Sequence, residues 1–412
     1  MSHLTTPLPL ITFQDIEAAA GRIKGAVYHS PCSRSIPLSE LTGMEIYCKL
    51  DNHQRTGSFK ERGARNALAQ LPGEQKERGV IAASAGNHAQ ALAYQGRLLG
   101  VPATVVMPKF APLIKINNCQ KLGATVVLHG KDFAEAKAHA HEIAQEKGLA
   151  YIDGYDDPAI IAGQGTAGLE VVAQVPDLDA VIVPVGGAGL LAGVSLAVKT
   201  LRPAVKIIAV EADHVASFSA ALDAGKPVRI ETRPTLADGL AIAQVGSNAF
   251  EVARQHTDKV VLVNEEQIAL AILRLVELEK AVVEGAAATT LAARLSGQLE
   301  ELAGKRVVLL LCGGNIDPNV LSRVIERGLV ADGRLSRFTA VISDRPGGLA
   351  DLTAQIAAAG ASIKQVLHDR AFASSDVSAV NVLCTVETRN RAHLEELLAR
   401  LQERGVKTII AP

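Results

Sequence analysis

The chain has 412 residues, 48% of them hydrophobic, which at about 150 residues per domain suggests two to three domains with large cores and excludes disordered and fibrous classes. Lys and Arg (42) nearly balance Asp and Glu (43), and aromatic residues are scarce, with eight Phe, five Tyr and no Trp. The chain therefore has no surplus of basic residues that would indicate a nucleic-acid or membrane-surface partner, and few aromatic side chains on which bases could stack.

The chain shows no targeting or membrane signal. The first residues carry Asp15 and Glu17 where a signal peptide would need a basic start and an apolar core. Residues 180–198 are free of charge but contain Pro184 and four glycines, which favours strand, loop and buried helix over a membrane span. Five cysteines without C-x-x-C spacing indicate reduced thiols, so we expect a cytoplasmic protein.

Strands and helices are expected to alternate through most of the chain. Short apolar runs predict buried strands at residues 45–50, 80–83, 103–107, 125–128, 180–185, 206–210, 259–263 and 306–311. Helix-length segments separate them at residues 88–99, 132–147, 164–173, 190–201, 266–278 and 317–327. Such alternation predicts parallel-type sheets covered on both faces, and so many strands indicate two sheets in two lobes. Ligands then bind at the carboxyl ends of the strands.

The pattern changes after Leu329. Strands are predicted at residues 337–343, 362–368 and 406–410, and alternating apolar residues predict another at residues 380–386. Apolar residues at helical spacing predict two helices between them, one near residues 349–356 and one near 394–401. The resulting βαββαβ order predicts a ferredoxin-like module of about 75 residues.

The first loop that could carry chemistry surrounds Lys60. Ser58 with Glu61 three residues later fits a capping box, so a helix should start here with Lys60 in its first turn. The helix dipole would then lower the pKa of the Lys60 amine, as a Schiff-base lysine requires. The alternative is an exposed lysine on an ordinary capped helix.

The second loop follows the strand at residues 80–83 and opens a helix. Its members are Ser84, Ala85, Gly86, Asn87 and His88. The backbone N–H groups of such a helix start suit a substrate carboxylate, and Asn87 could hydrogen-bond a phenolic oxygen. No second ligand accompanies His88, which disfavours a metal site.

The third loop follows the strand at residues 180–185 and suits a phosphate group. It contains Gly186, Gly187, Ala188, Gly189 and Leu190. The same loop also fits a dinucleotide fingerprint, because Gly187, Gly189 and Ala192 match G-x-G-x-x-A and Glu211 follows the next strand. An NAD-dependent dehydrogenase is therefore a second hypothesis, although it leaves the Lys60 and Asn87 loops unexplained.

The fourth loop, residues 311–316, follows the last strand of this region. Cys312 there is either a thiol facing a heteroaromatic nitrogen or a buried structural cysteine before a turn.

Together and in this order, the four loops resemble the threonine dehydratases (threonine ammonia-lyases) of the tryptophan-synthase-β-like group of pyridoxal-phosphate enzymes. The resemblance covers about residues 10–330, and residues 337–410 resemble an ACT domain, an amino-acid-sensing module. It implies a two-lobed catalytic domain at residues 1–330 with a small lobe at about 50–150, a linker at 331–336 and an ACT-like domain at 337–412. It also implies an amino-acid substrate and a homo-oligomer, either a dimer or a tetramer.

The resemblance implies roles for individual residues. Lys60 would hold pyridoxal phosphate and act as base at Cα, with Phe59 beside the ring and Asn87 on its 3′-oxygen. Residues 186–190 would bind the phosphate and residues 84–88 the substrate carboxylate. Gly239 and Glu284 match positions near the ring. Cys312 departs from the serine that is usual opposite the pyridine nitrogen, and a thiol would leave that nitrogen unprotonated.

The expected reaction is β-elimination of L-threonine, and of L-serine more weakly, to 2-oxobutanoate or pyruvate and ammonia. Serine racemase and 3-hydroxyaspartate dehydratase of the same group are alternatives, but Ala85 lacks the hydroxyl that racemases place on the second face. An amino-acid effector such as isoleucine or valine is expected at Asp344, Gly347, Gly348 and Leu349, unless the tail has a purely structural role. Whether a metal binds stays open.

Overall fold

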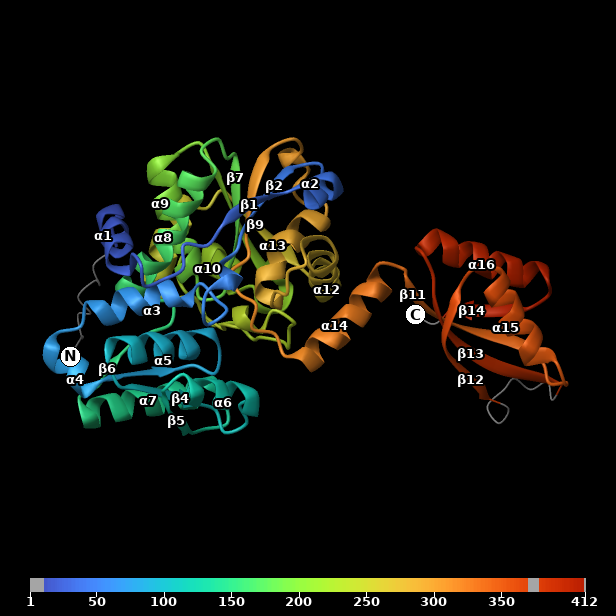
Figure 1. Cartoon of the computed structure of the whole chain (residues 1–412), viewed down its shortest axis with the longest axis horizontal. Helices are drawn as coiled ribbons and strands as arrows, with labels where there is room; N and C mark the ends of the chain where they lie inside the picture. The colour runs from blue at the N-terminus through green and yellow to red at the C-terminus, as the bar shows by residue number, and fades with distance from the viewer. Residues whose placement is uncertain (1–10, 370–377, 411–412) are drawn as a thin grey trace. The chain divides into compact units, whose positions relative to one another are not determined.

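The computed structural model describes residues 11–369 and 378–410 (Figure 1). The chain forms two compact units, Met1–Asp317 and Pro318–Pro412. The first unit contains two sheets with helices around them, and the second contains one antiparallel sheet with its own helices.

The larger sheet of the first unit has six strands in the order β1-β2-β10-β7-β8-β9. The strands are β1 (Cys32–Ser35), β2 (Glu45–Lys49), β7 (Ala180–Pro184), β8 (Lys206–Ala212), β9 (Lys259–Val263) and β10 (Arg306–Leu310). All neighbours are parallel except β1, which runs antiparallel to β2. Strand β7 is fully buried, as its unbroken apolar run predicts.

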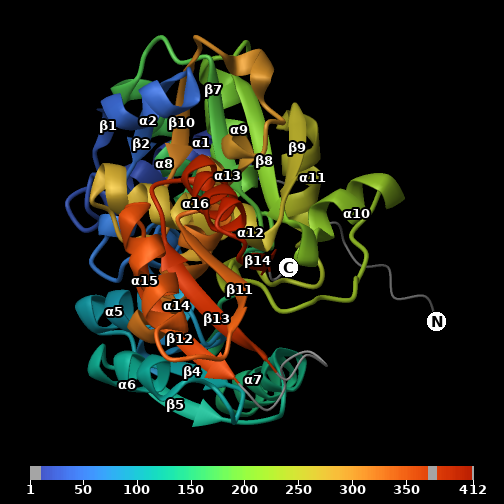
Figure 2. The same ribbon diagram turned by 90° about the vertical axis from the view of Figure 1, so that its right-hand side faces the viewer.

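The smaller sheet has four parallel strands in the order β5-β4-β3-β6. These are β3 (Val80–Ala83), β4 (Ala103–Met107), β5 (Thr125–Leu128) and β6 (Ala150–Tyr151). Strand β4 faces two cores, because Val105 and Met107 pack with Ala89 while Val106 between them packs with Ala136 on the opposite face. Both views place the larger sheet above the smaller one (Figures 1 and 2).

The helices of the first unit cover both sheets. They are α1 (Phe13–Ile23), α2 (Ile36–Thr42), α3 (Lys60–Ala69), α4 (Gly73–Arg78), α5 (Asn87–Leu99), α6 (Leu113–Lys121), α7 (Phe133–Lys147), α8 (Pro158–Gln174), α9 (Gly189–Leu201), α10 (Ser217–Ala224), α11 (Ser247–His256), α12 (Glu265–Arg274) and α13 (Gly285–Leu295). Short helical turns lie at Asp51–His53, Asp213–Val215, Asp238–Leu240 and Glu300–Leu302, and a π-helix lies at Leu275–Glu279. Helix α3 packs on α5 and α8 and so lies where the two sheets meet.

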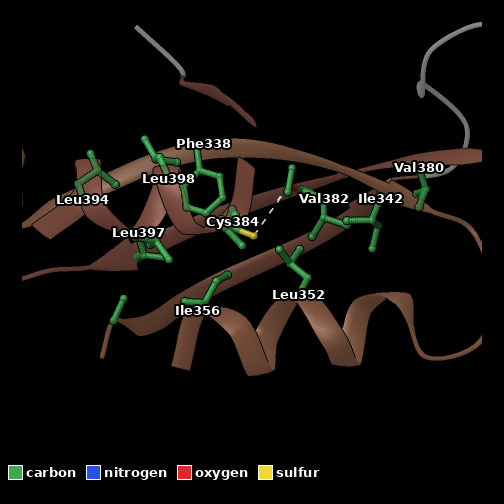
Figure 3. Close-up of a cluster of buried hydrophobic side chains, with 14 residues drawn as sticks. Phe338, Ile342, Leu352, Ile356, Val380, Val382, Cys384, Leu394, Leu397 and Leu398 are labelled. Carbon is green, nitrogen blue, oxygen red and sulfur yellow. Dashed lines mark hydrogen bonds between the residues drawn. The ribbon is translucent and has the colours of Figure 1, made fainter. Parts of the chain in front are cut away.

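The second unit has the predicted ferredoxin-like order. Its elements are α14 (Pro318–Ala331), β11 (Leu335–Ser343), α15 (Gly348–Ala358), β12 (Ser362–Asp369), β13 (Ala379–Glu387), α16 (Arg391–Glu403) and β14 (Lys407–Ile410). The antiparallel sheet has the order β12-β13-β11-β14. Phe338 and Cys384 from the sheet pack with Leu352 and Leu397 from the two helices in one buried core (Figure 3).

All eight strands predicted for the catalytic region form. Strands β1 and β6 were missed, because β1 (CSRS) has no apolar run and β6 has only two residues. The compact units divide at Asp317, not at the predicted boundary after residue 330, because α14 packs with the second unit on β11. The predicted linker 331–336 overlaps the end of α14 and the start of β11. Among the described residues, no helix is long and apolar enough to cross a bilayer.

Candidate active site

Helix α3 begins at Lys60, and the predicted capping box at Ser58 is wrong. No side chain caps this helix. The buried hydroxyl of Ser58 has no hydrogen-bond partner among the described residues, and the Glu61 carboxylate accepts from the backbone N–H of Thr56 and from Gln95. The local pattern fails because Ser58 is held in an isolated β-bridge to Gly313, far away in the sequence.

The Lys60 side chain is half-buried. Its Nζ donates a hydrogen bond to the carbonyl of Gly154. Burial lowers the pKa of Lys60 to about 8, against the opposing influence of Asp153, Cys312 and Glu284. The direction matches the prediction, and burial is the largest cause of the shift. An amine with this pKa has a substantial neutral fraction at neutral pH, which a nucleophile or base needs.

The residues around Lys60 are joined to the fourth loop. The backbone N–H of Phe59 donates to Cys312 (2.9 Å), and that of Gly314 donates to Gly57 (2.9 Å). A Cβ on Gly57 would lie 2.6 Å from Oδ1 of Asn315, so only glycine allows this approach. Burial raises the pKa of the Cys312 thiol well above its ordinary value, so this group next to Lys60 is a neutral thiol.

A chain of side-chain hydrogen bonds fixes Asn87. Its Nδ2 donates to Glu284 (2.8 Å to Oε1), and its Oδ1 accepts from Asn315 (2.8 Å). Burial raises the pKa of Glu284 to about 7, while the hydrogen bond from Asn87 opposes the shift. A Cβ on Gly313 would lie 2.2 Å from Oε1 of Glu284 and one on Gly239 would lie 3.4 Å away, so both glycines border this carboxyl group.

The third loop forms an anion cradle between β7 and α9. Within the described part of the chain, the backbone N–H groups of residues 186–190 have no hydrogen-bond acceptor. Ala188 adopts a left-handed conformation with φ of 71°, and the loop is almost entirely buried. Unpaired N–H groups at a buried helix start bind anions well.

Tyr155 connects this cradle to Lys60. A Cβ on Gly187 would lie 2.2 Å from the Tyr155 ring, and one on Gly189 would lie 2.3 Å from the Tyr155 carbonyl oxygen. Because Tyr155 directly follows Gly154, the cradle and the Lys60 amine contact neighbouring residues of one loop.

The second loop supplies another helix start. Ser84 Oγ accepts from the N–H of Gly86 (3.2 Å), and α5 then begins at Asn87. His88 is buried, its Nε2 lies 3.1 Å from the carbonyl oxygen of Ile152, and its Nδ1 has no partner among the described residues. Burial and nearby Lys60 lower the pKa of His88 to about 4, so the ring is neutral near pH 7.

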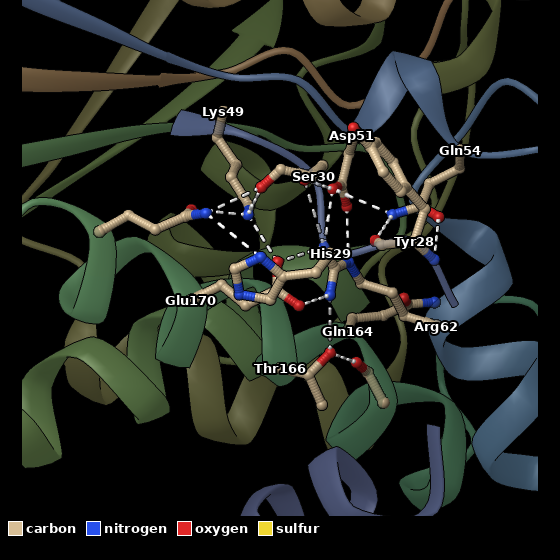
Figure 4. Close-up of polar contacts among 12 residues, drawn as sticks. Tyr28, His29, Ser30, Lys49, Asp51, Gln54, Arg62, Gln164, Thr166 and Glu170 are labelled. Atoms are coloured by element: carbon tan, nitrogen blue, oxygen red, sulfur yellow. Dashed lines mark hydrogen bonds and ion pairs between the residues drawn. The ribbon is translucent and has the colours of Figure 1, made fainter. Parts of the chain in front are cut away.

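A buried ion network supports the helix that carries Lys60 (Figure 4). The fully buried guanidinium of Arg62 pairs with both oxygens of Asp51 (2.7 and 2.8 Å) and with Glu170 (2.7 Å). Lys49 on β2 pairs with the same Glu170. The network therefore joins α3 to α8 and to the larger sheet. Sequence reasoning missed it because nothing in the sequence shows that these charges are buried together.

Glu211 does not have the geometry of a ribose-binding acid. Its side chain is buried, and its oxygens accept from the backbone N–H groups of Phe218 (2.7 Å) and Ser219 (2.9 Å) and from the Ser219 hydroxyl (2.6 Å). The carboxylate therefore stabilises the start of α10, which is a structural role.

One cluster among the described residues brings three metal-ligand types together. Ligand atoms of Asp213, His214 and Glu265 lie within 4.8 Å of one another. However, His214 Nδ1 already contacts the Pro234 carbonyl oxygen (2.6 Å), and the Glu265 carboxylate accepts from the Thr235 hydroxyl (2.6 Å). We assign the cluster no metal.

Comparisons with known proteins match this arrangement. The family model described as "Pyridoxal-phosphate dependent enzyme" matches residues 23–313. The chain is 43% identical to L-threonine ammonia-lyase of Thermotoga maritima, over 97% of this chain and the whole of that protein. The structure of processed threonine deaminase isoform 2 from Solanum lycopersicum matches with a TM-score of 0.74 at 36% identity, covering 79% of this chain and 99% of that one. Serine racemase from Dictyostelium discoideum matches with a TM-score of 0.71 at 37% identity, covering 74% and 99%.

Proposed function

The chain belongs to the family of pyridoxal-phosphate dependent enzymes, and from this premise we propose that it is an L-threonine ammonia-lyase that also accepts L-serine. The products would be ammonia with 2-oxobutanoate or pyruvate. The observation that carries the proposal is the half-buried Lys60 amine, which contacts the loop that also lines the anion cradle of Gly187. Family membership overturns the dehydrogenase hypothesis, in agreement with the structural role of Glu211.

The residues of the site fit pyridoxal phosphate. The unpaired N–H groups of residues 186–190 would hold its phosphate, and the fixed amide of Asn87 would bind its ring oxygen. Phe59 would lie beside the ring, and the neutral Cys312 thiol is a weak partner for the ring nitrogen. When bound, the cofactor supplies an aldehyde for amines and a ring that withdraws electrons from Cα.

The remaining chemistry belongs to the side chains and backbone of the chain. The neutral form of Lys60 can take a proton from Cα of the substrate, since its pKa is about 8. The free N–H groups at the start of α5 bind the substrate carboxylate, beside the neutral His88. Glu284 keeps the amide of Asn87 oriented. Burial of these groups excludes water and strengthens their electrostatic interactions.

A substrate screen that reads 2-oxoacid release tests this function. We expect release from L-threonine and L-serine, with little racemisation of serine, because Ala85 offers no acid or base on the second face of the site. Replacing Ala85 with serine is expected to increase racemisation at the expense of elimination, measured by chiral separation of the residual serine. Release from 3-hydroxyaspartate but not from threonine would favour the dehydratase alternative, and rapid racemisation by the unchanged enzyme would favour a racemase.

The second unit contains a cavity at the place predicted for an effector. The cavity has a volume of about 320 Å³ and is lined by Ile342, Ser343, Asp344, Arg345, Pro346, Gly347, Leu349, Ala350 and His368. Gly348 does not line it, because that residue packs against the end of β11, where a Cβ would lie 2.7 Å from the Ser343 carbonyl oxygen. The lining combines acidic, basic and apolar side chains, which suits an aliphatic amino acid, so the proposed function includes regulation by isoleucine or valine.

Filling this cavity is expected to abolish the response to the effector. Addition of isoleucine or valine should change the rate of the unmodified enzyme, and Ala350→Phe should remove that change because the ring occupies the cavity. Ala358→Phe, at the exposed end of the same helix and about two turns away from Ala350, is the matched control and should respond normally. If neither amino acid changes the rate or the cofactor affinity of the unmodified enzyme, the structural role of this unit is favoured.

A further inference from the structure

The loop at residues 153–157 contacts several parts of the active site. The Gly154 carbonyl accepts the hydrogen bond of the Lys60 amine. The Tyr155 ring packs on Gly187 of the anion cradle. Asp156 accepts from the backbone N–H of Ser247 (2.9 Å) at the start of α11. The position of this loop therefore determines where the lysine and the cradle lie relative to each other.

Asp153 holds the loop in its conformation. Its Oδ1 accepts from the backbone N–H groups of Tyr155 and Asp156, both at 3.0 Å. Its Oδ2 pairs at 2.9 Å with Lys137, whose side chain extends from α7. The Lys137 ammonium also lies 5.8 Å from the centre of the Tyr155 ring. Both side chains are mostly buried, with exposed fractions of 32% for Lys137 and 19% for Asp153.

We propose that Asp153 and Lys137 are positioning residues, an ion pair that orients the Gly154 carbonyl toward Lys60 and sets the net charge next to its amine. Neither residue needs to touch the substrate for this role. The inference rests on the assignment of Lys60 under the proposed function, and it adds two residues that the four loop motifs do not contain.

The charges that face Lys60 determine the direction in which its pKa should shift when the ion pair is changed. The groups that face the amine are Asp153 in the loop, His88 on α5, Glu284 before α13 and Cys312 after β10. The His88 ring and the Cys312 thiol are neutral near pH 7. Asp153 is the largest of the influences that favour the protonated amine, and its own pKa is lowered by Lys137 against the effect of burial. It is therefore ionised, and Lys137 offsets its charge.

Removing the charge of Asp153 and removing the charge of Lys137 should shift the titration midpoint of the Lys60 amine in opposite directions. Asp153→Asn keeps the acceptor for the loop N–H groups but removes the negative charge, so the midpoint should fall by about one pH unit. Lys137→Met keeps the apolar stem over Tyr155 but leaves the Asp153 charge without its partner, so the midpoint should rise by about half a unit to one unit. Lys137→Arg keeps the pair and should titrate like the unmodified protein.

The titration of Lys60 can be followed without catalysis. The full chain, freed of cofactor, is labelled with trace acetic anhydride over about pH 6 to 10, and acetylation of the Lys60 peptide is quantified by mass spectrometry. The acid limb of the kcat profile, which reports groups of the enzyme–substrate complex, should shift in the same directions. Lys131→Met is the matched control, because it removes an exposed pair with Glu135 and should leave the midpoint unchanged.

Opposite shifts for the two variants support the proposal. A purely structural pair would lower activity in both variants and leave the Lys60 midpoint in place, and that result, or shifts of the same sign, would overturn it. If Asp153→Asn does not fold, the upward shift in Lys137→Met still decides the question. Because labelling reports the amine itself, it remains informative even if the enzyme fails to deaminate threonine.

Discussion

Replacing Lys60 with alanine is expected to abolish turnover, by at least about a thousandfold, together with the visible absorbance of the bound cofactor. The reason is that the variant loses both the amine that would hold the cofactor and the base at Cα. Lys60 is the lysine whose amine contacts the Gly154 carbonyl, in the loop that borders the cradle. Absorbance spectra and 2-oxoacid release measure the two losses separately.

The control for this variant is Lys121→Ala, which changes an exposed lysine at the end of α6. It should keep both the absorbance and the rate. If the Lys60→Ala enzyme retained turnover within about tenfold of the unmodified rate, the assignment of this lysine would be refuted.

Replacing Asp51 with alanine is expected to destabilise the first unit by about 3–5 kcal/mol, since it leaves the fully buried guanidinium of Arg62 without its bidentate partner. Thermal or urea unfolding followed by calorimetry or circular dichroism measures this effect. Glu74→Ala removes an exposed pair with Arg78 and should cost less than about 1 kcal/mol. Equal losses for the two variants would contradict the importance of the buried network.

The same pair gives a pH dependence of stability. Burial alone would raise the pKa of Asp51, but Arg62 and Lys49 outweigh it and hold the pKa at about 2, below the ordinary value of 3.8. A carboxyl group with a lowered pKa in the folded state stabilises the protein above its unfolded pKa. This contribution should therefore be complete above about pH 4 to 5 and be lost as the pH falls toward 2, and the Asp51→Ala variant should lack this dependence.

The sequence predicted the strands well, together with the positions of the loops that follow them, since both depend on local signals. Continuous apolar runs correspond to buried strands such as β7 and β10. The glycines after β7 mark a tight loop, in which a larger residue at Gly187 or Gly189 would clash with Tyr155. Those signals do not depend on which parts of the chain meet in space.

Predictions that depend on distant contacts were less successful. The capping pattern at Ser58 and Glu61 is real as a sequence pattern, but the bridge to Gly313 holds Ser58 elsewhere. The pair of Lys137 with Asp153 joins residues 16 positions apart that are unremarkable in the sequence. Burial of Arg62 likewise arises from α8 and β2, which the sequence does not place around it.

The described contacts around Lys60 come from both sheets of the first unit, since Asn87 follows β3 of the smaller sheet while Gly187 and Cys312 follow β7 and β10 of the larger one. A molecule that binds all of these loops would link two halves of one folding unit. By mass action, loading with cofactor should therefore raise the free energy of unfolding of that unit by RT ln(1 + [L]/Kd), where [L] is the concentration of free cofactor. Enzyme abundance in a cell would then depend on cofactor supply as well as on synthesis.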